Sequence, residues 1–185
     1  MRILLAVIMV LALSSIAYAD PIEWSFASGG NGHYYDLVTF TNVFLNWTES
    51  RDLASTMIWQ GVHGHLVTLT SKAENDWVWS NLGGPWAYYL GGFQIKGAIE
   101  PDDGWQWITG EPWSFTNWAP GEPNNVTSGP SGSEDILEFA AWGLWNDNDM
   151  QQGPINYRLG FVVEYDFGSV PVQPTTWGHI KALYE

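Results

Sequence analysis

The sequence predicts an α+β domain with antiparallel sheets, and three observations support this fold class. The first half holds two segments with helical spacing of apolar residues, each preceded by a helix-capping residue. In the second half, short apolar runs alternate with Gly, Pro, Asn and Asp, as in strands joined by tight turns. The 13 Trp and 20 Gly favour many short elements around an aromatic core and exclude a helical bundle.

A strand and a helix are expected first. Aromatic and β-branched residues over 34–40 predict the strand. Asn46 and Glu49 match a capping box, so a helix is expected to begin there. Gly61 and Gly64 are expected to end it. Its buried face is predicted at the apolar positions with helical spacing, which are Leu53, Ala54, Met57 and Ile58.

A second strand and helix follow in the same order. The apolar run over 66–69 predicts a short strand. Ser71 and Glu74 resemble a second capping box, and Gly83 with Gly84 is expected to terminate the helix. The predicted buried face of this helix comprises Ala73, Trp77, Val78 and Leu82.

The rest of the domain is expected to be strands and one long loop. Between Ile108 and Ile136 a proline-containing stretch has no periodic pattern, and loops of this length in compact domains are usually functional. The order of elements excludes a doubly wound parallel sheet. The predicted strands are the apolar runs Tyr88 to Ile95, Trp105 to Ile108, Ile136 to Phe139, Gly143 to Trp145 and Leu159 to Tyr165.

The two ends of the chain differ from its middle. Residues 1–19 carry Arg2, an apolar run and a small-x-small site at Ala17 to Ala19, which predicts a cleavable signal peptide and a secreted protein. The apolar run is too short to span a bilayer, and no later segment predicts a membrane span. The expected organisation is therefore a signal peptide over 1–19, one domain over 20–167, and a linker and tail over 168–185.

Composition limits the partners. With 20 acidic and 6 basic residues the formal net charge is −14, which excludes a nucleic-acid binder and favours cations. The chain has no cysteine, so packing and bound metal must supply the stability that disulfides give many exported domains.

Oxygen-rich clusters flank the long loop at residues 122–125, 134–135 and 146–149. Carboxylate and amide oxygens suit Ca²⁺, which tolerates irregular geometry. Zinc is disfavoured, because cysteine is absent and the four histidines show no pairing with a third ligand; His63 and His65 are interpreted as structural. From composition alone, the clusters are equally compatible with ordinary turn residues in a solvated loop.

No pattern of residues predicts an enzyme. The pairs Asp102-Asp103 and Glu134-Asp135 are adjacent, so on a strand their side chains point to opposite faces and neither forms a glycosidase dyad. Nucleophile and phosphate-loop motifs are absent as well. A polysaccharide-active hydrolase remains an alternative that turnover of a polysaccharide would reveal.

The order of the motifs gives a stronger indication than their composition. After the two helical segments come Trp105-Gln106-Trp107, Gly121-Glu122-Pro123-Asn124-Asn125, Glu134-Asp135 and Trp145-Asn146-Asp147. Gly64 to Thr68 and Tyr89-Leu90-Gly91-Gly92 also match. Over residues 31–165 this series resembles a C-type lectin-like domain, here cysteine-free and of a type expected from a bacterial source.

The resemblance implies a calcium site and a cis proline. In the family, a Glu-Pro-Asn motif, an intervening Glu and a Trp-Asn-Asp motif ligate one Ca²⁺. The Pro is typically cis there, and Pro123 occupies that position. The matching ligands in this chain are Glu122, Asn124, Glu134, Asn146 and Asp147.

The resemblance also implies binding of glycans. In the family, two vicinal sugar hydroxyls ligate the metal and hydrogen-bond to its ligands, and Glu-Pro-Asn accompanies mannose, glucose, N-acetylglucosamine and fucose. The expected sugar contacts are Glu122, Asn124, Glu134 and Asn146. Because single sugar sites are weak, useful avidity would need several copies, as a homo-oligomer could supply; the sequence does not indicate the oligomeric state.

Two departures leave an alternative open. Family members outside bacteria normally carry disulfides, and this chain has none. The insert over 125–133, rich in Ser, Gly and Pro, could also shift the loop, so that a match in motif need not mean a match in sugar. The alternative is a calcium-stabilised lectin-like domain that binds protein partners or serves as a surface adhesion or structural module.

Overall fold

The computed structural model describes residues 20–40, 44–126, 129, 132–150 and 159–167. The predicted signal peptide and C-terminal tail lie outside these ranges, as does part of the insert in the long loop. None of the helices in the described ranges is long and apolar enough to cross a bilayer.

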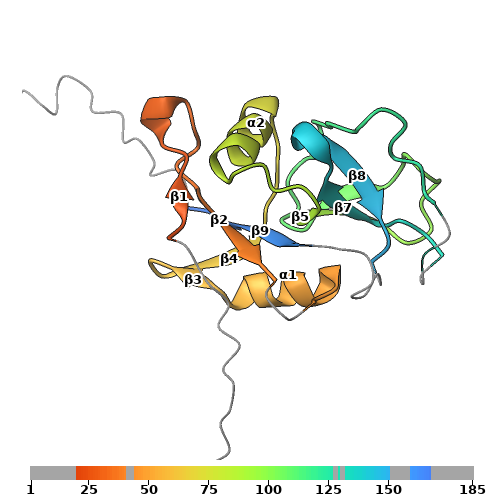
Figure 1. Ribbon diagram of the computed structural model, residues 1–185, viewed down its shortest axis with the longest axis horizontal. Coiled ribbons are helices and arrows are strands. Elements are labelled where there is room, and N and C mark those ends of the chain that lie inside the picture. Colours follow the sequence, from red (N-terminus) through yellow and green to blue (C-terminus); the bar gives the residue numbers. More distant parts are fainter. Residues whose placement is uncertain (1–19, 41–43, 127–128, 130–131, 151–158, 168–185) are drawn as a thin grey trace, which may run out of the picture.

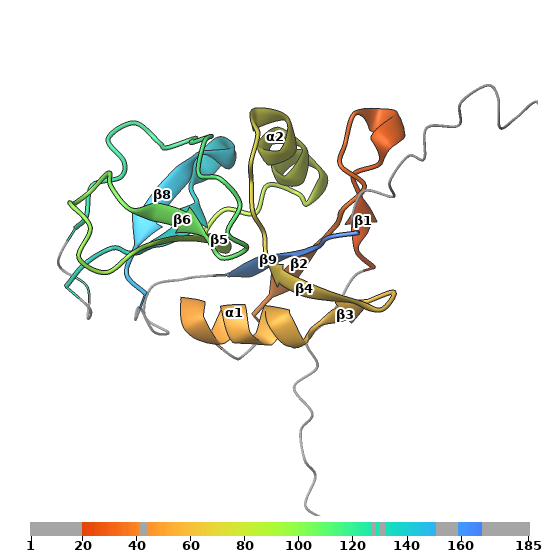
Figure 2. The same cartoon turned by 180° about the vertical axis from the view of Figure 1, so that it is seen from behind.

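The architecture is a mixed sheet with a helix on each side. The helices and strands are β1 (Ile22–Glu23), β2 (Tyr34–Thr39), α1 (Trp47–Thr56), β3 (Ile58–Trp59), β4 (Val62–Leu66), α2 (Lys72–Asn81), β5 (Tyr88–Gln94), β6 (Trp105–Trp107), β7 (Ile136–Phe139), β8 (Trp145–Asn148) and β9 (Gly160–Tyr165). Figures 1 and 2 show α1 and α2 on opposite sides of β2, β9 and β4. The predicted α+β class is confirmed.

Strand β9 joins the two parts of the sheet. It pairs with β2 along its whole length, with β4 over its second half and with β5 at its first two residues. From β5 the sheet continues to β7 and β8. The β5–β9 pairing is parallel, so the expectation of antiparallel pairing is wrong for this one contact. A buried central strand of this kind brings the first and last thirds of the chain together.

Helix α1 begins as predicted and ends earlier than predicted. The Asn46 side chain accepts from the backbone N of Glu49, and Glu49 accepts from the backbone N of Asn46. The helix stops at Thr56, so Ile58 belongs to β3 and is 59% exposed. Gly61 lies in the turn between β3 and β4 and Gly64 lies within β4, so neither glycine ends the helix. The β-branched and aromatic residues at 58–59 favour a hairpin there.

Helix α2 matches its predicted bounds, and three of the four residues of its predicted face, Trp77, Val78 and Leu82, belong to or pack against the core. Ser71 accepts from the backbone N of Glu74, yet the Glu74 carboxylate bonds Thr70 and the hydroxyl of Tyr35 instead of returning to Ser71. The buried residues are Glu74, Asn75 and Val78, while Ala73 is exposed. The predicted apolar face is therefore wrong at Ala73, because α2 docks through hydrogen-bonding side chains that an apolar pattern ignores.

The strand predicted over 66–69 is displaced toward the N-terminus. Strand β4 ends at Leu66, and Val67 and Leu69 follow it as buried residues outside the strand. The backbone of Val67 still bonds Val162 and Gly91. Burial of both residues explains why their apolar pattern resembled a strand.

The aromatic residues form the core on the α2 side. Trp145 is fully buried, and the rings of Trp107, Trp113 and Trp118 contact it at centroid distances of 5.7, 5.7 and 5.9 Å. Its indole N–H donates to Asn75 Oδ1 at 2.7 Å, and Asn75 Nδ2 donates to Gly143 O at 2.9 Å. Asn75 thus connects α2 to the start of β8.

Replacing Asn75 by Ala is expected to destabilise the domain by about 2–3 kcal/mol, since the buried indole N–H of Trp145 loses its acceptor. Chemical unfolding measures the free energy of unfolding. Asn81→Ala on the same helix removes an exposed side chain and should change it by less than about 0.5 kcal/mol. Equal effects of the two substitutions would contradict the role assigned to Asn75.

Candidate functional site

The long loop is fastened to β8 by backbone hydrogen bonds around Trp145. The backbone N of Trp145 donates to Asn117 O, and the backbone N of Ala119 donates to Trp145 O, both at 2.8 Å. Trp118 and Trp145 form an isolated parallel bridge. This attachment brings residues 122–126 beside the part of β8 that follows Trp145.

The Asp147 carboxylate organises the loop. Asp147 is 1% exposed and accepts from the backbone N of Asn124, at 3.1 and 3.0 Å to its two oxygens, and from the backbone N of Asn125 at 2.8 Å. The Glu122–Pro123 peptide bond just before them is cis. The Asp147 carboxylate therefore binds the loop through main-chain groups and leaves the Asn124 side chain exposed.

Glu134 connects the far end of the loop to the same segment. Its Oε2 accepts from the backbone N of Val126 at 2.7 Å, and its own backbone N donates to Asn125 Oδ1 at 2.9 Å. The backbone N of Val126 also lies 3.1 Å from Asn124 Oδ1. Four of the five predicted ligands, Glu122, Asn124, Glu134 and Asp147, thus belong to one hydrogen-bonded group.

Asn146 is oriented differently from its neighbour. It lies opposite Glu138 in the β7–β8 ladder, and its amide donates to Glu138 Oε1 at 3.2 Å and to Asp147 O at 2.5 Å. Successive side chains on a strand point to opposite faces, which separates Asn146 from the Asp147 carboxylate. The described contacts therefore do not bring Asn146 together with the other four side chains.

The group is rich in negative charge. Burial, a hydrogen bond with Asp147 and the charges of Asp147 and Glu134 raise the pKa of Glu122 to about 7. Glu122 Oε2 is buried and has no hydrogen-bond partner in the described part of the chain. A carboxylate oxygen of this kind, surrounded by other carboxylates, fits a bound cation better than it fits water.

The carboxylates are not yet at the spacing of a closed metal site. In the described residues, sets of three acidic or histidine side chains with ligand atoms all within 4.8 Å of one another occur around Glu164 instead. Glu122, Glu134 and Asp147 do not form such a set of three in the described residues. A calcium ion ligated by all three carboxylates would require this set to close up.

Two supporting residues escaped the sequence interpretation. Asn125 has a φ of 47°, a left-handed conformation that Asn tolerates, and it contacts both Asp147 and Glu134. In the sequence, the only local indication of this role is that the residue at position 125 is an Asn. Asn75 supports Trp145 from a different helix, and no local pattern indicates that contact.

Of the tryptophans near the motifs, Trp145 is fully buried and Trp113 and Trp118 pack against it. Trp142, by contrast, is 84% exposed. Trp145 therefore has no surface for stacking on a sugar ring.

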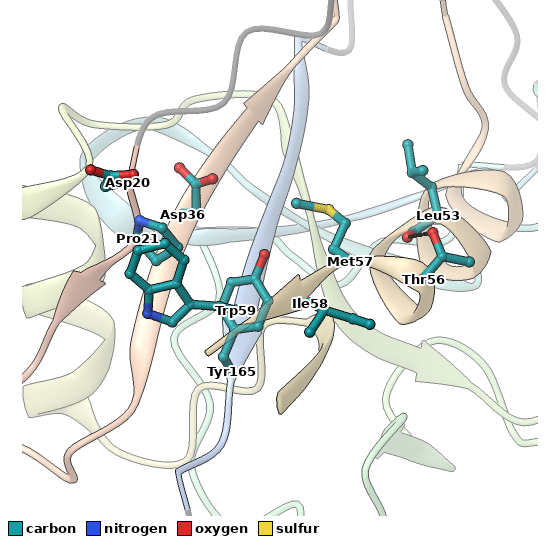
Figure 3. A pocket seen from close by; sticks show the side chains of 9 residues that line it. All are labelled: Asp20, Pro21, Asp36, Leu53, Thr56, Met57, Ile58, Trp59 and Tyr165. Carbon is teal, nitrogen blue, oxygen red and sulfur yellow. Dashed lines mark hydrogen bonds between the residues drawn. The ribbon is translucent and has the colours of Figure 1, made fainter. Parts of the chain in front are cut away.

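A separate cavity of about 360 Å³ lies among β2, α1, β3 and β9, as Figure 3 shows. The residues that line it include Asp20, Asp36, Trp59 and Tyr165. Burial raises the pKa of Asp36 to about 6. The cavity is lined by none of the predicted calcium ligands, so it is distinct from the loop site.

Comparisons with known proteins agree with the geometry. No protein-family model matches the chain. It is 30% identical over 128 residues to C-type lectin domain family 10 member A of Homo sapiens, covering 61% of this chain and 38% of that protein. It is 30% identical over 144 residues to asialoglycoprotein receptor 2 of Rattus norvegicus, covering 76% of this chain and 42% of the receptor. The chain thus spans less than half the length of these two relatives, whose names describe lectins and receptors rather than enzymes.

Solved structures match over most of the domain. The C-type lectin CEL-I from Cucumaria echinata superposes with a TM-score of 0.57 at 21% identity, covering 75% of this chain and 93% of that one. At this identity the likeness concerns the fold. Together with the motif order and the two relatives, it identifies the described part of this chain as a C-type lectin-like domain.

Proposed function

We propose that this chain is a secreted, calcium-dependent carbohydrate-binding protein whose site is the loop group around Asp147. The observation that carries this proposal is one hydrogen-bonded group formed by three separate segments: residues 122–126, Glu134 and Asp147. Oxygen donors from loops are the ligands that Ca²⁺ selects. Asn146 completes the proposed set of five if its amide turns from Glu138 toward the loop.

Each residue has a separate part in binding. Asp147 holds the backbone of Asn124 and Asn125, so the Asn124 side chain is presented at the surface. Glu122 supplies acceptor oxygens, and the amide of Asn124 supplies both a donor and an acceptor. Bound calcium would supply open coordination positions for two vicinal hydroxyls of a sugar.

The proposed ligands are glycans with mannose-type hydroxyls, which include glucose, N-acetylglucosamine and fucose. A Glu122 acceptor paired with an Asn124 amide gives each of two neighbouring hydroxyls one acceptor and one donor. The relatives support a carbohydrate ligand, since they are named as lectins and as a receptor for asialoglycoproteins. Avidity from several copies would strengthen a shallow single site.

Asn124→Ala is expected to abolish calcium and sugar binding together, because it removes a ligand oxygen while the backbone N of Asn124 still bonds Asp147. Calorimetry with Ca²⁺, then with mannose at saturating Ca²⁺, measures both. Asp147→Ala should have the same effect and also loosen the loop. Asp76→Ala, an exposed acidic residue on α2, is the matched control and should bind as the natural chain does. Sugar binding retained in Asn124→Ala would disprove the mechanism.

Mannose is expected to displace a bound glycoconjugate at least about tenfold better than galactose, a difference of about 1.4 kcal/mol. The measurement is competition by the free monosaccharides at fixed Ca²⁺, repeated with a chelator. If calcium binds but neither sugar competes, the domain recognises protein partners and the alternative of an adhesion module replaces the lectin.

Protons are expected to compete with calcium at Glu122. Its pKa is raised to about 7 by burial and by Asp147 and Glu134, and the carboxyl must release its proton to ligate a cation. The calcium association constant should therefore reach its full value above pH 7 and fall about tenfold for each pH unit below it. Calcium titrations at about pH 7.5 and about pH 5.5 test this. An affinity independent of pH across that range would exclude Glu122 as a ligand.

A further inference from the structure

A second group of metal-ligand side chains lies at the other end of β9. In the β2–β9 ladder Tyr35 is opposite Glu164, and in the β4–β9 ladder His65 is opposite the same Glu164. His33 precedes Tyr35 by two residues and Asp166 follows Glu164 by two, so side chains at both positions share the face of Glu164. Strand register alone therefore gathers two imidazoles and two carboxylates.

The ligand atoms of this group are close together. His33 Nδ1 lies 2.8 Å from Glu164 Oε1 and 3.3 Å from Asp166 Oδ1. His65 Nε2 lies 3.0 Å from Asp166 Oδ1. Ligands in a tetrahedron with bonds of about 2.0–2.1 Å are about 3.3 Å apart, a spacing that these three distances approach. The ligand atoms of His65, Glu164 and Asp166 all lie within 4.8 Å of one another, as do those of His33, Glu74 and Glu164, and Glu164 is common to both sets.

The orientation of His65 is that of a metal ligand. Its Nδ1 lies 2.9 Å from Leu66 O, and because a carbonyl oxygen only accepts, Nδ1 must carry the hydrogen. Histidine ligands typically donate their second ring N–H to such an acceptor. Its Nε2 is buried and faces Asp166 Oδ1 at 3.0 Å.

Glu164 is held in a similar way. It is 1% exposed, and its Oε2 accepts from the backbone N and the hydroxyl of Thr68 at 2.9 and 3.0 Å. The other oxygen, Oε1, is thereby directed at His33. The neighbouring Glu74 accepts from Asn31, Tyr35 and Thr70, and its carboxylate lies within 4.8 Å of the ligand atoms of His33 and Glu164, so it adds negative charge to the group.

We propose that His33, His65, Glu164 and Asp166 bind one divalent transition-metal ion of the zinc type. Imidazole nitrogens favour zinc over calcium, whose ligands are oxygens, so this site differs in chemistry from the loop around Asp147. Three carboxylates, Glu74, Glu164 and Asp166, surround the two imidazoles and attract a cation. Asp166 is 43% exposed and gives the ion a route from solvent.

The test uses the purified chain without a polyhistidine tag and with the loop site saturated by Ca²⁺. Zn²⁺ is titrated by calorimetry, and Co²⁺ absorption reports nitrogen and oxygen coordination independently. The variants are His33→Gln, His65→Gln and Asp166→Asn, with circular dichroism to confirm folding. His63→Gln is the matched control, since His63 is an exposed histidine two residues from His65 on the same strand.

The expected result is one equivalent of bound Zn²⁺, with affinity lowered at least about tenfold by each of the three variants and unchanged in His63→Gln. Asp147→Ala should retain zinc binding, which separates this site from the proposed calcium site. The proposal is overturned if the chain binds no zinc at about 1 mM, or if His33→Gln and His65→Gln bind it as well as the natural chain does. Either result would leave the four residues as an ion-pair network without metal.

Discussion

The buried hydrogen bond between Trp145 and Asn75 is the contact on which the candidate loop site depends. It joins α2 to the first residue of β8, and the backbone of that same residue holds residues 117 and 119 of the long loop. Asp147, two residues further on, then receives the amides of Asn124 and Asn125. A polar pair inside an aromatic core is costly unless both groups are satisfied, and here the indole N–H and both ends of the Asn75 amide are. The position of the loop is therefore determined by contacts with the buried core.

The sequence predicted those elements whose signals are local. The capping box at Asn46 and Glu49 placed the start of α1, and Ser71 placed the start of α2. The order of the Glu-Pro-Asn and Trp-Asn-Asp motifs led to the correct fold, although each motif is short. The ligand assignment for the loop stays a prediction. Four of its residues belong to one hydrogen-bonded group, whereas the Asn146 amide bonds Glu138 and the Asp147 carbonyl, as its place in β8 opposite Glu138 dictates.

What the sequence could not predict depends on partners distant along the chain. Helical periodicity ran past Thr56 because Met57 and Ile58 are apolar, and only their pairing in a hairpin assigns Ile58 to a strand. Val67 and Leu69 are buried without being in a strand. His65 was interpreted as structural because no third ligand stands nearby in sequence. Its neighbours His33 and Asp166 arrive through the β2–β9–β4 pairing, which no local spacing reveals.

The tryptophans around Trp145 also provide an intrinsic spectroscopic signal for the loop. Indoles at centroid distances of 4.5 to 5.9 Å and at steep angles couple their electronic transitions, and Trp113 and Trp118 belong to the loop itself. Any ligand that rearranges residues 122–126 acts on a segment attached to these tryptophans through Ala119 and Trp145. Near-ultraviolet circular dichroism and intrinsic emission would thus report occupancy of the loop without a label, while a change confined to His33 and His65 would leave this chromophore undisturbed.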